Sequence, residues 1–317
     1  MKNDNEILVS IHCLTYNHAP YIRECLDGFV MQKTNFRYEI VIHDDASTDG
    51  TADIIREYEK KYPDLFNAIY ETENQYAKYN GSFHEILSSM QKAMRGKYIA
   101  YCEGDDYWIE SYKLQKQVDF LESHPDYTMC FHKALEHFET DSSKDKETKV
   151  VTRDYCGPEI LTHMYATTAS VMFRRSIYDT ELYKKVLREK KFFGGDATLF
   201  LTCAHYGKIR GMEDCMSVYR RECGGVTGSI DFRKLANEAL AYEETFGPAY
   251  HKASEEFFHS GCWYAYIQLK AKGNKKEAET YLHKSFKRSF WGALRPIFNY
   301  YRRAIIRRIK RYTKTNR

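Results

Sequence analysis

A regular alternation of strand-like and helical segments over the first hundred residues is the feature that most constrains the fold. Short apolar runs rich in β-branched residues predict strands, and the longer stretches between them place apolar residues at helical spacing. Strands that alternate with helices in this way favour an α/β fold with a doubly wound, mostly parallel sheet. The predicted strands cover 7–14, 38–43, 67–70 and 97–102, and the predicted helices cover 19–31, 51–61 and 83–94.

The rest of the chain divides near residue 230. Strand and helix signals are mixed up to that point, and beyond it every signal is helical. We therefore expect an α/β domain over 1–229 and a C-terminal helical extension over 230–317. Further helices are predicted over 113–123, 197–205, 232–242, 255–270 and from 276 onward, and further strands near 129–131, 169–173, 208–212 and 215–219.

Unusual polar residues follow three of the predicted strands. Thr15, Tyr16 and Asn17 follow the first strand, Asp44–Ser47 the second, and Glu103–Trp108 the strand over 97–102. Ligands of doubly wound sheets bind beyond the carboxyl ends of the strands. Three separate strand ends that deliver polar groups to one edge therefore predict a ligand site there.

Asp105 and Asp106 lie on a tight turn after a predicted strand and a glycine. Two carboxylates placed this way can bind a hard divalent cation and leave coordination positions for phosphate oxygens. Mn²⁺ or Mg²⁺ fits this chemistry, whereas zinc would require His or Cys neighbours. The alternative is a solvated acidic turn that caps the next helix.

Asp44 and Asp45 open a second acidic segment, Asp-Asp-Ala-Ser-Thr-Asp-Gly-Thr. A carboxylate at this strand end can accept hydrogen bonds from a nucleobase or a ribose, and Tyr16 could stack on a base ring. Ser47, Thr48 and Asp49 are also good N-cap residues for the helix that begins at Thr51. Both roles can hold together, because capping needs only one of these side chains.

Two further signals have both a functional and a structural interpretation. Gly194-Gly195-Asp196 places an acid at the start of a helix, where the N-terminal dipole tends to lower the pKa of a carboxylate; the alternative is a simple helix cap. Tyr107-Trp108 could form a flat platform for a sugar or an acceptor, or could pack in the core.

Taken together, these motifs resemble those of the family 2 glycosyltransferases with the GT-A fold. The resemblance rests on ILVSIHCLTYNHAPYI, EIVIHDDASTDGT, GKYIAYCEGDDYW and the GGD before a helix, with a Val-Tyr-Arg…Gly-Gly segment near 218–225, and it covers about residues 5–228. The chain is most similar to bacterial enzymes that build capsular or lipid-linked surface polysaccharides.

The resemblance implies transfer of a sugar from a nucleotide diphosphate donor, a UDP-sugar above all, to a hydroxyl of a glycan or lipid-linked acceptor, with inversion at the anomeric carbon. By position in the motifs, Asp196 matches the catalytic base and Asp106 the metal ligand. The residues that match the donor nucleotide site are Thr15, Tyr16, Asn17, Asp45 and Asp105.

This sequence departs from the family pattern at several positions. Glu103 opens the metal motif, and Gly195 stands where an acid often precedes the base. The Gln/Arg-x-x-Arg-Trp signature of processive members is missing, which favours a non-processive hexosyltransferase. A nucleotidyltransferase would need a glycine-rich loop with a basic residue after the first strand, and LTYNHAP has neither. A non-catalytic protein that binds a nucleotide-sugar or a polysaccharide is the alternative that stays open.

The last part of the chain differs from the rest in charge. Residues 284–317 carry 12 Lys and Arg and no acid, which leaves 36 basic residues against 44 acidic ones elsewhere, a net charge of −8. Such an acidic body argues against a general nucleic-acid binder. In the tail, aromatic and aliphatic residues recur every three or four positions between the basic ones, and Pro296 is expected to bend or divide the helix.

A cationic amphipathic helix of this kind suits an anionic membrane surface; the alternatives are packing on the acidic body and nonspecific attraction to nucleic acid. No apolar run reaches the ~18 residues of a membrane span, and the N-terminal residues lack the apolar core of a signal peptide. Nine cysteines without CxxC spacing indicate reduced thiols rather than a zinc site or a disulfide framework. We therefore expect a cytoplasmic protein, peripheral on the inner face of the membrane; the oligomeric state has no sequence signal.

Overall fold

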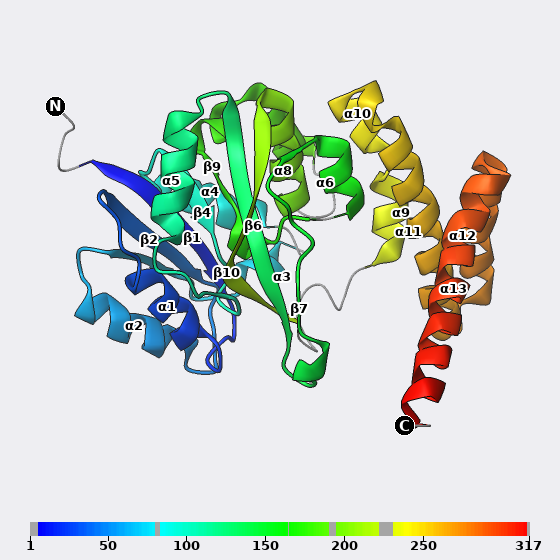
Figure 1. The fold of residues 1–317 in the computed structure, drawn as a ribbon, viewed down its shortest axis with the longest axis horizontal. Coiled ribbons are helices and arrows are strands. Elements are labelled where there is room, and N and C mark those ends of the chain that lie inside the picture. The colour runs from blue at the N-terminus through cyan, green and yellow to red at the C-terminus, as the bar shows by residue number, and fades with distance from the viewer. Residues whose placement is uncertain (1–5, 80–82, 164, 190–194, 222–230, 316–317) are drawn as a thin grey trace. The chain divides into compact units, whose positions relative to one another are not determined.

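The computed structural model describes residues 6–79, 83–163, 165–189, 195–221 and 231–315, with side chains described as far as residue 302. The chain forms two compact units (Figure 1). The first comprises Met1–Glu189 with Gly195–Cys223, and the second comprises Lys190–Gly194 with Gly224–Arg317.

The first unit is built on one sheet with the strand order β3-β2-β1-β4-β9-β6-β10-β5, which β7 and β8 extend by pairing with β6 and β10. Strands β3, β2, β1 and β4 are mutually parallel, and so are β6 and β10; β9 runs antiparallel between these two blocks. The expected α/β fold with a mostly parallel sheet is confirmed. The strands are β1 (Ile7–Thr15), β2 (Arg37–Asp44), β3 (Phe66–Tyr70), β4 (Tyr98–Tyr101), β5 (Tyr107–Trp108), β6 (Tyr127–Phe138), β7 (Lys146–Glu147), β8 (Asp154–Tyr155), β9 (Met172–Arg174) and β10 (Lys208–Arg221).

Helices of the first unit cover the sheet and bury its apolar runs. Alternate residues of β1, β2 and β4, such as Ile11, Ile42 and Ala100, share one core with apolar residues of three helices, α1, α2 and α5. This alternation follows from the pleat, which sends successive side chains to opposite faces. The helices are α1 (Ile22–Val30), α2 (Thr51–Lys61), α3 (Gln75–Lys78), α4 (His84–Ala93), α5 (Lys113–Ser123), α6 (Gly157–His163), α7 (Glu181–Glu189) and α8 (Gly195–Tyr206), with short 3-10 turns at Ser142–Lys144, Thr168–Ser170 and Arg175–Asp179.

The sheet differs from the sequence prediction in its second half. The strands expected over 208–212 and 215–219 form the single strand β10, whose pairing with β6 shifts register between Met212 and Ser217. The strand expected near 129–131 extends to Phe138 in β6. The extension mixes charged and apolar residues, with Lys133 half-buried and Glu136 buried, so its sequence lacks the continuous apolar run that predicts a buried strand.

The second unit is helical throughout its described part. Ala236 of α9 packs with Cys262 and Leu269 of α11 and with Ala278 and Tyr281 of α12. A side chain at Gly261 would lie 2.8 Å from the backbone nitrogen of Ala236, so only glycine permits the close approach of α9 to α11. The helices are α9 (Phe232–Glu238), α10 (Ala241–Phe246), a 3-10 turn at Pro248–Tyr250, α11 (His251–Ala271), α12 (Lys275–Arg288) and α13 (Phe290–Thr315).

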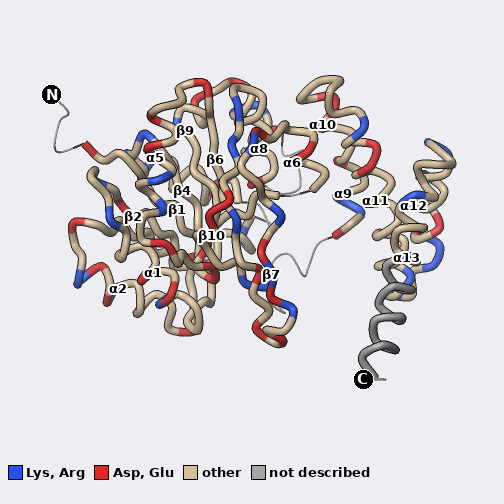
Figure 2. The backbone as a smooth tube through the Cα atoms, in the orientation of Figure 1, with Lys and Arg blue, Asp and Glu red and all other residues tan. Residues whose placement is uncertain are grey.

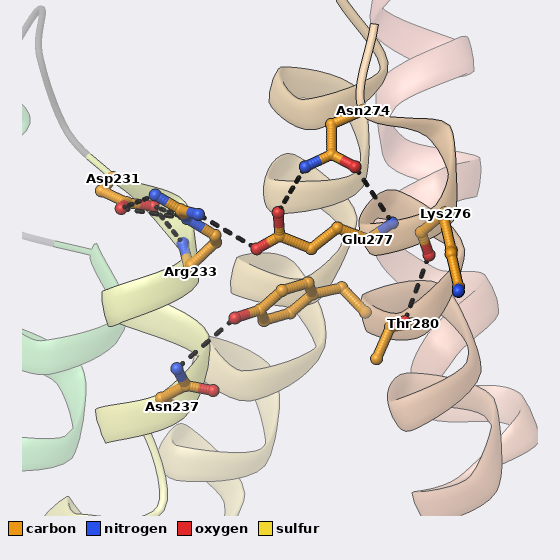
Figure 3. A network of polar contacts seen from close by, with 8 residues as sticks. Asp231, Arg233, Asn237, Asn274, Lys276, Glu277 and Thr280 are labelled. Carbon is orange, nitrogen blue, oxygen red and sulfur yellow. Dashed lines mark hydrogen bonds and ion pairs between the residues drawn. The ribbon is translucent and has the colours of Figure 1, made fainter. Parts of the chain in front are cut away.

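A polar network joins α9 to the start of α12 (Figure 3). Arg233 pairs with Asp231 at 2.8 Å and with Glu277 at 3.0 Å. The side chain of Asn274 accepts a hydrogen bond from the backbone N–H of Glu277 and donates one to its carboxylate at 2.6 Å. Glu277 therefore serves both the N-cap of α12 and the contact with α9.

The division of the C-terminal helices lies before Pro296 rather than at it. The break is at Ser289, which has an extended backbone, and α13 continues through the proline. Ala293 is buried, and Tyr300 packs against Trp263 of α11, so tertiary contacts hold α13 on both sides of Pro296. No helix among the described residues is both long and apolar enough to cross a bilayer.

Helices α12 and α13 carry many basic residues, of which Arg288 and Arg295 pair with Glu255 and Glu256 of α11, and α13 also exposes aromatic rings. Trp291 is 78% exposed and Phe298 68% exposed. The described basic residues of these two helices are Lys275, Lys276, Lys284, Lys287, Arg288, Arg295 and Arg302 (Figure 2).

Candidate active site

The three polar strand ends meet at one edge of the parallel block. The register pairs Thr15 with Asp44, and the backbone N–H of Asp45 donates to the carbonyl of Thr15 at 3.0 Å. On the other side of β1, the N–H of Gly104 donates to the carbonyl of Leu14 at 2.9 Å. The loops after β1, β2 and β4 are therefore adjacent, as the sequence predicts for the carboxyl ends of parallel strands.

The loop after β1 is held by the loop after β2. Asn17 adopts a left-handed backbone (φ 54°); its N–H donates to Ser47 Oγ and its Oδ1 accepts from the N–H of Thr48, both at 2.8 Å. Of the expected N-cap residues, only Asp49 binds the first turn of α2, through Thr51. Tyr16 is 46% exposed, so its ring is accessible at this edge.

Asp44 and Asp45 are both buried but have different partners. Both oxygens of Asp45 accept backbone N–H groups of α3, from Gln75 at 2.6 Å and Tyr76 at 3.1 Å. Asp44 Oδ2 accepts from the N–H of Ser47 at 3.1 Å, while its Oδ1 has no partner among the described residues. A carboxylate can accept about four hydrogen bonds, so Asp45 keeps free acceptor capacity.

The acidic turn after β4 is packed tightly against β1. A side chain at Gly104 would lie 2.7 Å from Thr15 Oγ1, which explains the glycine before the two aspartates. Asp106 is 1% exposed. Its Oδ1 accepts from the backbone N–H of Arg220 at 2.8 Å, and its Oδ2 finds no partner within the described ranges. Burial raises the pKa of Asp106 well above its usual value, and the charges of Asp105 and Glu103 add to the rise.

Asp196 lies within electrostatic reach of this turn. Burial raises the pKa of Glu103 to about 8, and the charges of Asp105 and Asp196 contribute. Asp196 lies in the first turn of α8, where its Oδ1 accepts from the N–H of Ala197 at 2.8 Å; Gly194 lies outside the described residues. The expectation of a lowered pKa is wrong, because burial outweighs the backbone N–H groups and raises the pKa of Asp196.

His18 connects the two acidic segments and was not singled out from the sequence. Burial lowers its pKa, while the charges of Asp105, Asp49 and Asp44 act in the opposite direction. Its Nδ1 has no described hydrogen-bond partner, and neither has Thr15 Oγ1. Buried polar atoms are almost always hydrogen-bonded in native proteins, so four orphaned atoms at one edge indicate a site built for a polar ligand. These atoms are Thr15 Oγ1, His18 Nδ1, Asp44 Oδ1 and Asp106 Oδ2.

The two aromatic residues after the acidic turn have different environments. Trp108 is 2% exposed, its Nε1 donates to the carbonyl of Ala169 at 2.9 Å, and its ring packs edge-on against Phe29. This environment favours core packing over a sugar platform for Trp108. Tyr107 is only partly buried and lies against the guanidinium of Arg220, 4.5 Å from the ring centre.

Asp106 is the residue best suited to a divalent cation, since a buried carboxylate oxygen without a partner is an open ligand position. No group of three or more His, Cys, Asp or Glu side chains in the described parts of the chain is arranged to hold a metal. A separate cavity of about 360 Å³ lies beside Asp44 and the start of α2, and Asp105, Asp106 and Asp196 do not line it.

The model of the family described as "Glycosyl transferase family 2" matches residues 10–223, which hold all the acidic residues of this edge. The chain belongs to glycosyl transferase family 2. Its family 2 domain thus includes the acidic turn, the loop after β2 and the start of α8.

An uncharacterised protein of Mycobacterium tuberculosis is 39% identical over 231 residues, which cover 72% of this chain. The match spans 63% of that relative's length. Among solved structures, TarS from S. aureus in complex with UDP-GlcNAc has a TM-score of 0.62 at 15% identity, covering 87% of this chain and 81% of TarS. The mannosyltransferase PcManGT from Pyrobaculum calidifontis, in complex with GDP-Man and Mn²⁺, has a TM-score of 0.54 at 18% identity. The match covers 98% of this chain and 84% of PcManGT. At these identities the two structures establish the GT-A-like fold of this family 2 member.

Proposed function

We propose that this family 2 glycosyltransferase is a metal-dependent, inverting and non-processive hexosyltransferase. It transfers a sugar from a nucleotide diphosphate donor to a hydroxyl of a glycan or lipid-linked acceptor in polysaccharide biosynthesis. The observation that carries the proposal is the buried Oδ2 of Asp106, which has no partner among the described residues and lies beside Glu103 and Asp105 at the carboxyl end of β4.

The donor nucleotide binds at the edge formed by the loops after β1 and β2. Tyr16 offers an exposed ring for stacking on the base. Asp45 reads the base with the acceptor capacity that its bonds to α3 leave free, and Thr15, Asn17 and Asp105 complete the nucleotide site. The complexes of TarS with UDP-GlcNAc and of PcManGT with GDP-Man support a nucleotide-sugar donor, and we favour a UDP-sugar.

Asp106 holds Mn²⁺ or Mg²⁺ through its free oxygen. When bound, such an ion neutralises negative charge that develops on the leaving diphosphate. The complex of PcManGT with Mn²⁺ supports this cofactor. The donor diphosphate and water would supply further oxygen ligands to such an ion.

Asp196 acts as the general base that removes the proton of the acceptor hydroxyl. Its raised pKa makes it a stronger base than an ordinary aspartate. Asp196 begins α8 whereas Asp106 follows β4, so base and metal ligand come from different elements. In-line attack with inversion requires this, because nucleophile and leaving group lie on opposite sides of the sugar.

The C-terminal helices attach the enzyme to an anionic membrane surface, on the cytoplasmic side. The exposed Trp291 and Phe298 and the basic residues of α12 and α13 support this placement. Aromatic side chains insert at the interface, and each basic residue near such a surface contributes about 1 kcal/mol.

A donor panel tests the proposed reaction. The chain is incubated with UDP-sugars and GDP-sugars, with Mn²⁺ or with EDTA, and the released nucleotide is measured for the wild type and for Asp196→Asn. We expect the wild type to turn over one donor in the presence of Mn²⁺ but not in EDTA. We expect Asp196→Asn to bind the same donor with little turnover. Binding of a donor without turnover by the wild type would instead establish the non-catalytic alternative.

A further inference from the structure

Arg220, near the end of β10, is the most heavily bonded side chain at the acidic edge, and neither the motifs nor the family match gives it a role. Its side chain is 4% exposed. The guanidinium pairs with Glu24 of α1 and with Glu139, the residue after β6, the latter at 2.7 Å. It also lies against the rings of Tyr21 and Tyr107, at 5.0 and 4.5 Å from their centres.

The same residue contacts both aspartates of the acidic turn. Its backbone N–H donates to Asp106 Oδ1 at 2.8 Å, and its Nη1 donates to the carbonyl oxygen of Asp105 at 2.6 Å. The backbone bond directs one oxygen of Asp106 toward β10, and the other, Oδ2, has no partner in the described part of the chain. The side-chain bond fixes the peptide that joins the two aspartates.

The charge of Arg220 does not oppose a bound cation. Two carboxylates, Glu24 and Glu139, face the single guanidinium. With Asp105 and Asp106, the cluster carries four acids against one base when all are ionised. The guanidinium thus supplies directed hydrogen bonds while the local charge stays favourable to a divalent ion.

We propose that Arg220 is a positioning residue that holds Asp105 and Asp106 in the arrangement that binds the divalent cation. This inference rests on the proposed metal-dependent function. Lysine cannot replace arginine here, because an ammonium lacks the planar fork of donors that reaches Glu24, Glu139 and the Asp105 carbonyl together. Loss of a group that orients a metal ligand weakens metal affinity by about 10- to 100-fold.

The test compares Arg220→Lys with Arg221→Lys, the same substitution one residue further along β10. Arg221 pairs with Glu136, which Lys146 also contacts, so its replacement leaves the acidic turn untouched. Mn²⁺ binding is measured by the EPR signal of free Mn²⁺, with UDP and in parallel with GDP, and nucleotide affinity is measured separately in EDTA.

We expect Arg220→Lys to weaken Mn²⁺ binding by about 10-fold or more. Its nucleotide affinity in EDTA should be unchanged. Arg221→Lys should bind Mn²⁺ as tightly as the wild type. If Arg220→Lys binds Mn²⁺ with the same affinity as the wild type, this inference is wrong and the proposed metal role is unaffected. If the wild type binds no Mn²⁺ in the presence of UDP or of GDP, the proposed metal role is wrong, and this inference is wrong with it.

Thermal melts show whether Arg220→Lys folds. If Arg220→Lys does not fold, Glu139→Gln tests the inference instead, because this substitution weakens the contact between Glu139 and the guanidinium while Arg220 itself is kept. Weaker Mn²⁺ binding by Glu139→Gln supports the inference, and unchanged binding contradicts it.

Discussion

The carboxylate of Asp106 and the backbone N–H of Arg220 are joined by a 2.8 Å hydrogen bond across 114 positions of the chain. The bond ties the turn after β4 to the last residues of β10, three places further along the strand order. It occupies one oxygen of Asp106, and the other oxygen is buried with no partner among the residues that the structure describes. The proposed metal site therefore depends on β10 as well as on the acidic turn.

Asp106→Asn is expected to remove most of the Mn²⁺-dependent nucleotide release. The amide keeps an oxygen for the N–H of Arg220 but supplies no negative charge to a cation. Loss of one group that stabilises developing charge costs about 10²- to 10³-fold in rate. Release is measured against Mn²⁺ concentration, with Asp119→Asn, an exposed acid of α5, as the control. Wild-type rates in Asp106→Asn would contradict the role of this residue.

Asp196→Asn is expected to lower the transfer rate by about 10²- to 10⁴-fold, the usual contribution of a general base, with donor affinity retained. The base acts only when it is deprotonated, and burial raises its pKa. The increase of the wild-type rate with pH should therefore occur at a higher pH than the pKa of an ordinary aspartate would give. Rate–pH profiles at saturating donor report this. A profile that is flat from pH 4 to 8 would argue against Asp196 as the base.

Glu103 should make the metal-free protein less stable as the pH rises. Its pKa is about 8 in the folded chain against an ordinary value of 4.5, so between these values the folded state holds a proton that the unfolded state has lost. Stability conferred by that proton is present at low pH and is lost as the pH approaches 8. Glu103→Gln should flatten this dependence and raise the Tm at pH 8. Melts in EDTA from pH 5 to 8 measure both, and parallel curves for the two proteins would refute the expectation.

Replacing both Trp291 and Phe298 with serine should release the chain from anionic vesicles. Both side chains are largely exposed, so the Tm should change little. A large apolar side chain contributes about 1.5–3 kcal/mol when fully buried, which predicts a loss of vesicle affinity of roughly 10-fold or more. Sedimentation with vesicles is the measurement, and Tyr206→Ser, another exposed aromatic residue, is the control. Equal sedimentation of the double variant and the wild type would exclude these two rings as anchors.

The sequence predicted the part of the fold in which local signals agree with tertiary packing. The runs that form β1, β2 and β4 are apolar and buried, and their polar ends mark the edge where the loops meet. The sequence does not predict the far half of β6, because Lys133, Glu136 and His137 interrupt its apolar residues. The single strand β10 was read as two, because polar residues interrupt it where its register shifts.

At the site, sequence motifs indicated the residues but not their environments. Asp45 is bonded to a helix that begins 30 residues further along the chain, and the raised pKa of Asp196 depends on how the folded chain surrounds it. Arg220 stands in a Val-Tyr-Arg segment whose bonds to Asp105 and Asp106 exist only once β10 lies beside β5. His18 has no local pattern to mark it. Such contacts arise from tertiary structure, which a single sequence does not encode in readable form.

The most direct test of the whole account is a crystal structure of the protein with UDP and Mn²⁺, with the ion located by its anomalous scattering. We expect one Mn²⁺ bound to Asp106 and to the diphosphate, the base against Tyr16 and Asp45, and Asp196 facing the same site. An ion away from Asp106, or a nucleotide bound at another part of the protein, would contradict it.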